Sequence, residues 1–284
     1  VEYTGKVVDA SAFQMAIEKV REVLGIQRPR VAIVCQKGMW AMLNTENAFK
    51  VVPPENYELV GRWDVARTAT DVTAEYNAIK ALDVQIIHHV IDGHAGVITS
   101  RAWAVPEIPA VQVGANIPGM SLAHWDATRG YCNWEGPDMQ STGEDCAITP
   151  TTLPFYNEFM DRVGENPNYI ACFTIDGVHL FKEAIERADS LDSDDVVAAM
   201  EKSDYTGVNG RVRFTQKGSV RPHDSIFGPE QTWVNTQWQD GHCYVVWPDG
   251  KARLGLEEFE GVRYPGTRDF QLPPWMVEYW KGKS

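Results

Sequence analysis

Hydrophobic residues follow two alternating patterns through the first 114 residues of the chain. A short continuous apolar run, typical of a strand that is covered on both faces, occurs at 30–35, and further strand-like stretches occur at 57–63, 84–89 and 110–113. Between these runs, apolar residues recur at helical spacing over 9–24, 40–49, 71–82 and 95–103. Strands and helices that alternate in this way predict parallel strands with crossover helices, which form a doubly wound α/β sheet.

The pattern changes after residue 114. Residues 115–150 are rich in Gly, Pro, Asp and Trp and have no sustained period, so we expect them to cross between two lobes. Helical spacing resumes over 151–163, 170–188 and 193–200, and strand-like runs follow at 211–214, 231–237 and 243–247. The last two runs are joined at Asp240-Gly241, which predicts a hairpin. The proline-rich end predicts a segment that lies across the surface and buries Trp275 and Trp280.

Composition narrows the classes of function. The chain has 284 residues, of which 44% are hydrophobic and 23% are charged, as in ordinary globular proteins. A net charge of −13 argues against a nucleic-acid partner, because phosphate binding needs clustered Lys and Arg. The apolar runs are too short to span a bilayer. The first residue is Val1 and no signal peptide precedes it, which we expect of an exported protein that has lost its leader or of a truncated chain.

The five cysteines leave two alternatives open. None of them forms a C-x-x-C pair, so the common zinc and redox spacings are absent. Cys132 and Cys146 flank a loop-like stretch and could form a disulfide in an oxidising compartment. The alternative is that both are small buried thiols.

Several stretches of the chain resemble segments of a known protein family and follow one another in the same order as in that family. These stretches are 30–40, 70–83, 84–93, 108–114, 149–161, 166–188 and 194–210. Together they resemble the branched-chain amino acid–binding (leucine/isoleucine/valine-binding protein-like) family, whose members are solute receptors of ABC transporters. The resemblance implies the periplasmic-binding-protein type I fold, in which two α/β lobes with doubly wound parallel sheets are joined by a hinge. It also implies capture of a small molecule without catalysis or a cofactor, and delivery to an ABC permease.

The family pattern predicts how the chain is divided. Residues 1–130 and 224–255 would form the second lobe, 131–223 the returning part of the first lobe, and 256–284 a surface tail. The match begins part-way into the family's chain, so the resemblance implies a further N-terminal segment of the first lobe, cleaved off, omitted or present as a separate chain. Without it, we expect an exposed apolar patch formed by Phe155, Phe159, Phe181 and Ile185. The resemblance implies a periplasmic or extracellular location. The further N-terminal segment could carry a membrane anchor.

Ligands of such folds lie beyond the carboxyl ends of the strands. Trp40 matches a ligand-contacting aromatic of the family, and the alternative is a core residue that opens the following helix. Asn116 stands near the position of a family carboxylate that neutralises a ligand ammonium. A neutral Asn argues against a plain aliphatic amino acid, although Asp92 could replace the counter-ion. The sequence therefore predicts a neutral, aromatic or carboxylate-bearing ligand.

Further candidates lie on the loops and on the first-lobe helices. His88 and His89 end a strand and point to opposite faces, so we expect no metal site with Asp92 and His94. Asp92 and His94 are predicted polar ligand contacts, with a solvated loop as the alternative. Phe173 and Asp176 lie where the family's first lobe faces the cleft, although Phe173 would also suit a core position.

Enzyme hypotheses find no support in the motifs. The chain lacks a G-x-S-x-G elbow, a phosphate-binding loop and a G-x-G-x-x-G turn after a strand. We therefore predict an extracytoplasmic solute-binding protein that works by hinge closure. One alternative is the ligand-sensing domain of a receptor or regulator with the same fold. Another is a Rossmann-type enzyme, for which a bound nucleotide or turnover would be evidence.

Overall fold

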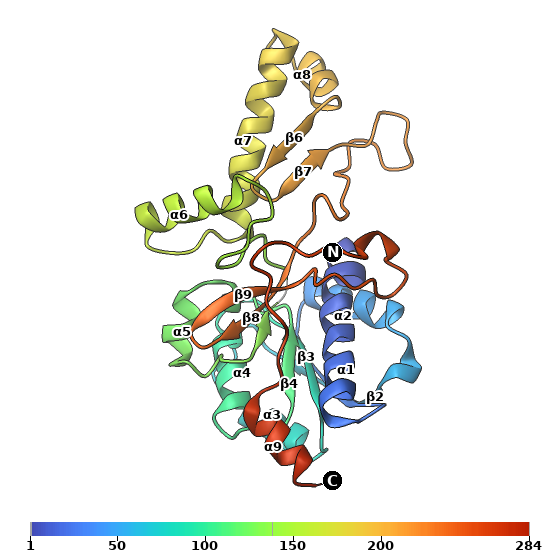
Figure 1. Cartoon of the computed structure of the whole chain (residues 1–284), viewed down its shortest axis with the longest axis vertical. Helices are drawn as coiled ribbons and strands as arrows, with labels where there is room; N and C mark the ends of the chain where they lie inside the picture. Colours follow the sequence, from blue (N-terminus) through green and yellow to red (C-terminus); the bar gives the residue numbers. More distant parts are fainter. Residues whose placement is uncertain (1, 138, 284) are drawn as a thin grey trace.

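The computed structural model describes residues 2–137 and 139–283, which form two units of unequal size (Figure 1). The sheet unit contains the described residues up to 147 and from 232 onward, and the helical unit contains residues 148–231. The first and last described residues, Glu2 and Lys283, belong to the sheet unit, so the helical unit is an excursion in the middle of the sequence.

A five-stranded parallel sheet forms the centre of the sheet unit. Its strands lie in the order β2-β1-β3-β4-β5. Their bounds are β1 Arg30–Gln36, β2 Glu58–Val65, β3 Ile86–Val90, β4 Val111–Gly114 and β5 Gly136–Pro137. Strand pairing is parallel throughout, so the predicted doubly wound α/β architecture is confirmed. Because β3 follows β2 in sequence but pairs with β1, the strand order reverses between β1 and β3.

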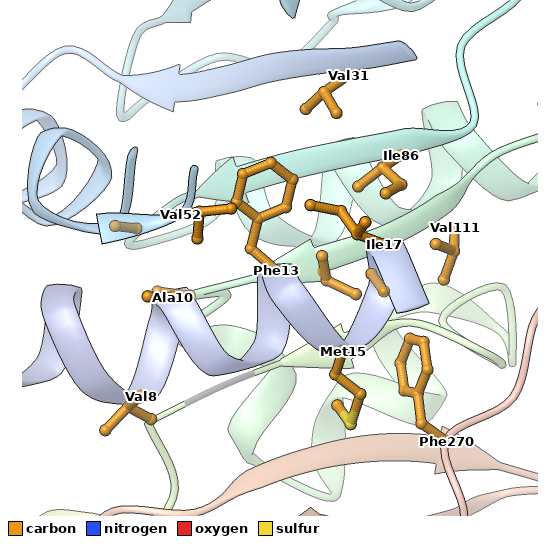
Figure 2. Packing of buried hydrophobic residues seen from close by; sticks show 14 of the residues in the cluster. Val8, Ala10, Phe13, Met15, Ile17, Val31, Val52, Ile86, Val111 and Phe270 are labelled. Atoms are coloured by element: carbon orange, nitrogen blue, oxygen red, sulfur yellow. The ribbon is translucent and has the colours of Figure 1, made fainter. Parts of the chain in front are cut away.

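Helices cover both faces of this sheet. Their bounds are η1 Thr4–Asp9, α1 Ala10–Leu24, α2 Met39–Val51, α3 Thr73–Lys80, α4 Ala95–Ala104 and α5 Ala123–Thr128, with short turns at η2 Pro54–Asn56, η3 Pro118–Met120 and η4 Glu257–Phe259. On one face, Phe13 and Ile17 of α1 pack against Ile86 and Val111 of the sheet (Figure 2). On the other face, α3 and α4 bury a second apolar cluster that includes Trp103. Alternate residues of β1 face the two clusters, which explains its continuous apolar run.

The stretch 115–150 was predicted to cross between lobes, and for most of its length this is wrong. Residues 115–147 stay in the sheet unit, where they form η3, α5 and the edge strand β5. β5 packs beside the hairpin of β8 Asn235–Gln239 and β9 His242–Trp247. The predicted hairpin is confirmed, since Asp240 and Gly241 have φ values of 53° and 91°. The chain crosses to the helical unit near residue 148 and returns near residue 232.

The end of the chain lies along the sheet unit and finishes in a helix, α9 Pro274–Lys281, that the sequence did not predict. Trp275 donates its indole N–H to the Ile108 carbonyl at 3.0 Å, and Trp280 donates to the Pro109 carbonyl at 2.6 Å. The tail therefore docks through its tryptophans, as expected. Pro273 and Pro274 begin α9 because proline fits the first helical turn, where its missing N–H costs nothing.

The helical unit consists of α6 Thr152–Val163, α7 Tyr169–Ala188, α8 Ser193–Met200 and the short antiparallel pair β6 Asp204–Gly207 and β7 Gly210–Arg213. The three helices match their predicted positions, while β6 was missed. Asn168 begins α7 by accepting the backbone N–H groups of Ile170 and Ala171. This unit has no larger sheet among the described residues. Phe181 is 53% exposed, and Phe155, Phe159 and Ile185 are half-buried, so the predicted patch is only partly open.

All five cysteines are free and buried. Cys132 packs with Trp238 and Cys243, whereas Cys146 packs in a separate cluster with Val234 and Val245. The structure therefore favours the alternative of small buried thiols over a bridge between Cys132 and Cys146. Among the residues that the structure describes, no helix is both long enough and apolar enough to cross a bilayer.

Candidate functional site

The carboxyl ends of β1 and β3 meet where the strand order reverses, which is the usual ligand position in open α/β sheets. The Gln36 side-chain oxygen, at the end of β1, accepts the backbone N–H of Asp92 at 2.9 Å. The loops after β3 and β4 are tied together in turn, because Ile117 donates its backbone N–H to the Ile91 carbonyl at 3.0 Å. Three loops from distant parts of the sequence therefore form one rigid rim.

A hollow of about 360 Å³ lies above this rim, lined by Thr4, Trp40, Asp92, Ile117, Met139, Tyr169 and Trp233. The lining comes from both units. Tyr169 is the first residue of α7 in the helical unit, and Trp233 lies on the segment that returns to β8. The hollow is within the size range of small-molecule sites, and the crossing segments lie beside it.

Three aromatic side chains give the hollow its character. Trp40 is the second residue of α2 and is partly buried against the sheet core. Tyr169 and Trp233 have ring centroids 5.1 Å apart, and Phe173 lies 5.1 Å from Trp233 on the next turn of α7. The rings of Tyr169 and Trp233 form a continuous aromatic wall that Phe173 supports.

The six predicted site residues fall into three groups. Trp40 and Asp92 line the hollow, and Phe173 stands behind it against Trp233. His94 is exposed at the start of α4 and does not line the hollow. Asn116 and Asp176 are buried, and each has a hydrogen-bonding role described below.

Asp176 stabilises the helical unit. Its carboxylate accepts the backbone N–H groups of Val208 and Asn209 at 2.8 and 3.1 Å, and the Asn209 side-chain amide at 3.1 Å. These bonds hold the turn between β6 and β7 against α7. Burial raises the pKa of Asp176 despite these donors. Gly207 allows this approach, because a Cβ there would lie 2.2 Å from the carboxylate.

Residues 10–228 match the family model described as periplasmic binding protein. The chain belongs to this family. Members of the family bind solutes and are not enzymes, and the family is one of periplasmic or extracellular proteins. No curated protein sequence matches the chain.

Solved structures of other periplasmic binding proteins share the two-lobed α/β fold. A solute-binding protein from R. palustris in complex with benzoate matches with a TM-score of 0.65 and 11% identity, over 84% of this chain and 62% of that one. An isoleucine-bound transporter substrate-binding protein from Streptococcus pneumoniae matches with 0.65 and 16%, over 83% and 63%. A Rhodopseudomonas palustris protein with 3,4-dihydroxybenzoic acid matches with 0.62 and 14%, over 92% and 66%. The chain therefore spans somewhat less than two thirds of these proteins.

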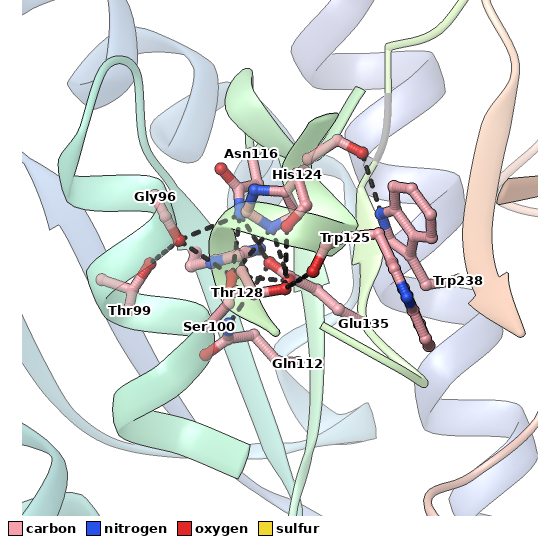
Figure 3. A network of polar contacts seen from close by, with 12 residues as sticks. Gly96, Thr99, Ser100, Gln112, Asn116, His124, Trp125, Thr128, Glu135 and Trp238 are labelled. Atoms are coloured by element: carbon pink, nitrogen blue, oxygen red, sulfur yellow. Dashed lines mark hydrogen bonds and ion pairs between the residues drawn. The ribbon is translucent and has the colours of Figure 1, made fainter. Parts of the chain in front are cut away.

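A buried polar network lies beneath the rim of this binding protein, centred on Glu135 just before β5 (Figure 3). Glu135 accepts hydrogen bonds from Ser100 at 2.6 Å and from the Asn116 amide at 2.7 Å. His89 and His124 lie 3.3 and 3.5 Å from the same carboxylate. Gly96 makes room for Asn116, since a Cβ at Gly96 would lie 2.1 Å from the Asn116 oxygen.

This network keeps one carboxylate charged in the interior. Burial alone would raise the pKa of Glu135, but His124, His89 and the Ser100 hydroxyl outweigh it and lower the pKa to about 2. Burial lowers the pKa of His89 to about 4, so its imidazole is neutral at pH 7. Ser100, His124 and Glu135 are all buried. A serine, a histidine and a carboxylate could together suggest a catalytic group, but no substrate could reach the buried Ser100 hydroxyl. We therefore assign the cluster a structural role.

His88 has its own buried partner on the other face of β3. Its Nε2 lies 2.9 Å from the Asp9 carboxylate, and Asn44 donates to the same carboxylate at 2.8 Å. The expectation that His88 and His89 point to opposite faces is confirmed. Among the described residues, no group of three or more His, Cys, Asp or Glu side chains is arranged to hold a metal ion.

Sequence reasoning missed Tyr169, Trp233, Met139, Ile117 and Thr4 as lining residues. Tyr169 is the first residue of a helix that follows an Asn cap, and Trp233 lies just before β8. Nothing in the local sequence marks either position as part of a binding site. These five residues come from five separate places along the chain, and only the fold brings them to one hollow.

Proposed function

We propose that this chain is the larger part of an extracytoplasmic solute-binding protein that captures a small organic, ring-bearing solute and presents it to an ABC permease. The observation that carries the proposal is the hollow lined by Trp40 from the sheet unit and Tyr169 from the helical unit. A solute that contacts both would favour the arrangement in which the units are close, and so shift an open–closed equilibrium.

The hinge that this mechanism requires would lie at the two crossings, near residues 148 and 232. The bridge between Gln140 and Val234 belongs to the sheet unit, whereas the bridge between Gly210 and Gln231 belongs to the helical unit. We therefore propose lobe boundaries near these crossings, later along the chain than the predicted boundaries at 131 and 224.

A thermal-shift screen against amino acids, aromatic acids, amines and nucleotides tests the solute-binding proposal. A solute present at 100 times its dissociation constant stabilises the folded protein by about 2.7 kcal/mol, which is several degrees in melting temperature. Stabilisation by one solute class, lost in Trp40→Ala, is the expected result. Stabilisation by nucleotides alone, or by no solute, would contradict the proposal.

We further propose that the helical unit packs against additional polypeptide, of the same protein or of a separate chain. Val178 and Phe181 of α7 and Val197 of α8 are 59%, 53% and 46% exposed. Phe181 and Val197 also border an apolar hollow between α7, α8 and the loop after β7. Large apolar side chains gathered on one face favour a protein contact.

Self-association of the 284-residue chain tests this second proposal. We expect concentration-dependent association in sedimentation velocity that the double variant Phe181→Ser, Val197→Ser reduces. Val105→Ser is the matched control, because Val105 is 53% exposed on the sheet unit. Equal effects of the control and the double variant would contradict a specific role for the α7–α8 face.

A further inference from the structure

A second recess, of about 430 Å³, lies between α3 and α4 of the sheet unit. We call it the α3–α4 groove. One wall is formed by α3, which contributes Thr73 and Asn77, and the other by a stripe of α4 that contains Ile98, Arg101 and Val105. Residues three or four positions apart lie on one face of a helix, so each helix presents one face to the groove. The groove shares no lining residue with the hollow between the two units.

Arg101 brings a positive charge to this groove that no described residue neutralises. Of the arginines that the structure describes, only Arg101 and Arg129 have side chains without a hydrogen-bonding or ionic partner. Arg129 is exposed, whereas Arg101 is half-buried in the wall of the groove. A guanidinium presents its N–H donors in a planar fork, which binds a carboxylate through two parallel hydrogen bonds.

The opposite wall adds a second donor. The side-chain amide of Asn77 lines the groove and has no partner among the described residues. Lys80, at the end of α3, donates to the carbonyl of Pro106 at 2.7 Å, and Pro106 also lines the groove. An ammonium therefore stands beside the groove, and both walls favour a negatively charged group.

Asp71 is the acidic residue of the described lining, and its carboxylate is already engaged. It accepts the backbone N–H of Thr73 at 2.8 Å and the Thr73 hydroxyl at 2.6 Å, and these bonds lower the pKa of Asp71. Asp71 is exposed and makes no ion pair with Arg101. Water and salt screen such an exposed charge, so Asp71 does not cancel the attraction of Arg101 for an anion.

The α4 wall is otherwise apolar. Ile98, Ala102, Val105 and Pro106 follow one another along it, and Val105 is 53% exposed. The volume is typical of small-molecule sites and exceeds what an inorganic anion would fill. A ligand that satisfies the whole groove therefore has an anionic end and an apolar body.

We propose that the α3–α4 groove binds a small organic carboxylate, with its carboxylate on Arg101 and Asn77 and its apolar body along Ile98 and Val105. This would be a second site, which does not depend on solute capture in the hollow between the units. A cation in the last turn of α4 also favours the helix dipole, but that role alone would give the groove no affinity for carboxylates.

Isothermal titration of the 284-residue chain with matched probes tests the inference. The panel holds hexanoate and cyclohexanecarboxylate, the alcohol and the amine of each frame, and inorganic phosphate. We expect the better carboxylate to bind about tenfold or more tightly than its alcohol, because only the carboxylate makes charge-assisted bonds to a guanidinium. The amine and phosphate should bind more weakly than this carboxylate, since the amine has the wrong charge and phosphate has no apolar body.

Variants of the groove locate the binding. Arg101→Gln should reduce carboxylate binding to the level of the alcohol, and Arg101→Lys should retain part of it, because lysine keeps the charge without the planar fork. Asp71→Asn should not weaken carboxylate binding, whereas it would weaken binding of a cation. Arg129→Gln is the matched control, because it removes the same charge from an arginine that has no described partner and does not line the groove.

Trp40→Ala separates this groove from the hollow between the units and should retain the carboxylate binding that depends on Arg101. Binding that is lost in Trp40→Ala but not in Arg101→Gln would place the carboxylate in the hollow and overturn the inference. Equal affinity for carboxylate and alcohol, equal losses in Arg101→Gln and Arg129→Gln, or no carboxylate binding would overturn it as well. The proposed solute capture would stand in each case, since the thermal-shift screen tests it separately.

Discussion

The side-chain amide of Asn116 donates a hydrogen bond of 2.7 Å to the carboxylate of Glu135, and both residues are completely buried. Asn116 follows β4 at the rim of the hollow, but its amide points down into the sheet unit (Figure 3). A neutral amide at this position is thus explained by the buried carboxylate that it stabilises. The next residue, Ile117, is the one that reaches the hollow.

We predict that Asn116→Asp lowers the free energy of unfolding by about 3 kcal/mol or more. The change puts a second carboxylate against Glu135 and removes one of its donors, with no room for water between them. Urea unfolding at pH 7 measures the effect. The control is Asn77→Asp on the exposed face of α3, which should change stability by less than about 0.5 kcal/mol. Equal stability of the two variants would contradict the role assigned to Asn116.

Acid should destabilise the protein in two overlapping steps. The pKa of His89 is lowered from its usual 6.5 to about 4, so protonation favours the unfolded chain, and stability falls as the pH drops from 6.5 to 4. The pKa of Glu135 is lowered from 4.5 to about 2, so its contribution is lost as the pH drops from 4.5 to 2. Urea unfolding at intervals between pH 7 and pH 2 follows both.

Two variants separate the His89 contribution from those of other histidines. His89→Leu cannot titrate, so its stability should depend less on pH between 6.5 and 4 than that of the parent protein. His242→Asn removes an exposed histidine that pairs with Glu144 at 2.7 Å and should leave the dependence nearly unchanged. A His89→Leu profile parallel to the parent profile would show that His89 does not contribute.

Asp176→Ala should destabilise the protein by about 3 kcal/mol, because it leaves three donors of Val208 and Asn209 without their acceptor. Hydrogen exchange should be faster at the backbone amides of Val208 and Asn209, and unchanged in β1. Asp195→Ala, at an exposed aspartate in the first turn of α8, is the control. If the two amides remained as protected as in the parent, the structural role of Asp176 would be wrong.

Trp40→Ala should weaken binding of the best solute roughly thirtyfold, since removal of a central aromatic anchor costs about 2 kcal/mol or more. Trp40→Phe should recover part of this loss. Isothermal titration measures both, and melting curves without solute show whether the fold is intact. Tyr131→Ala, at an aromatic residue that is 41% exposed and does not line the hollow, should bind normally. Normal binding by Trp40→Ala would contradict the assignment of the hollow as the solute site.

The sequence predicted the parallel sheet well because β1 is apolar on both faces, as covered parallel strands are, and because strand-like and helical stretches alternate. It also placed α6, α7 and α8 close to their observed bounds. It missed α9, whose two initial prolines are common both in loops and in first helical turns. It misassigned residues 115–147, since β5 has only two residues and α5 only six, too few for a period to be recognised.

For the site, the pattern along the chain was sufficient to place Trp40 and Asp92 on loops beyond strand ends, because alternation of strands and helices dictates which loops share an edge. It was not sufficient to say which way Asn116 points, or that Tyr169 and Trp233 join the same hollow. Those features depend on contacts between residues far apart in sequence, such as the bond from Asn116 to Glu135 and the tilted ring contact between Tyr169 and Trp233. Local patterns encode which face of an element is buried, whereas the packing of whole elements determines which side chains meet.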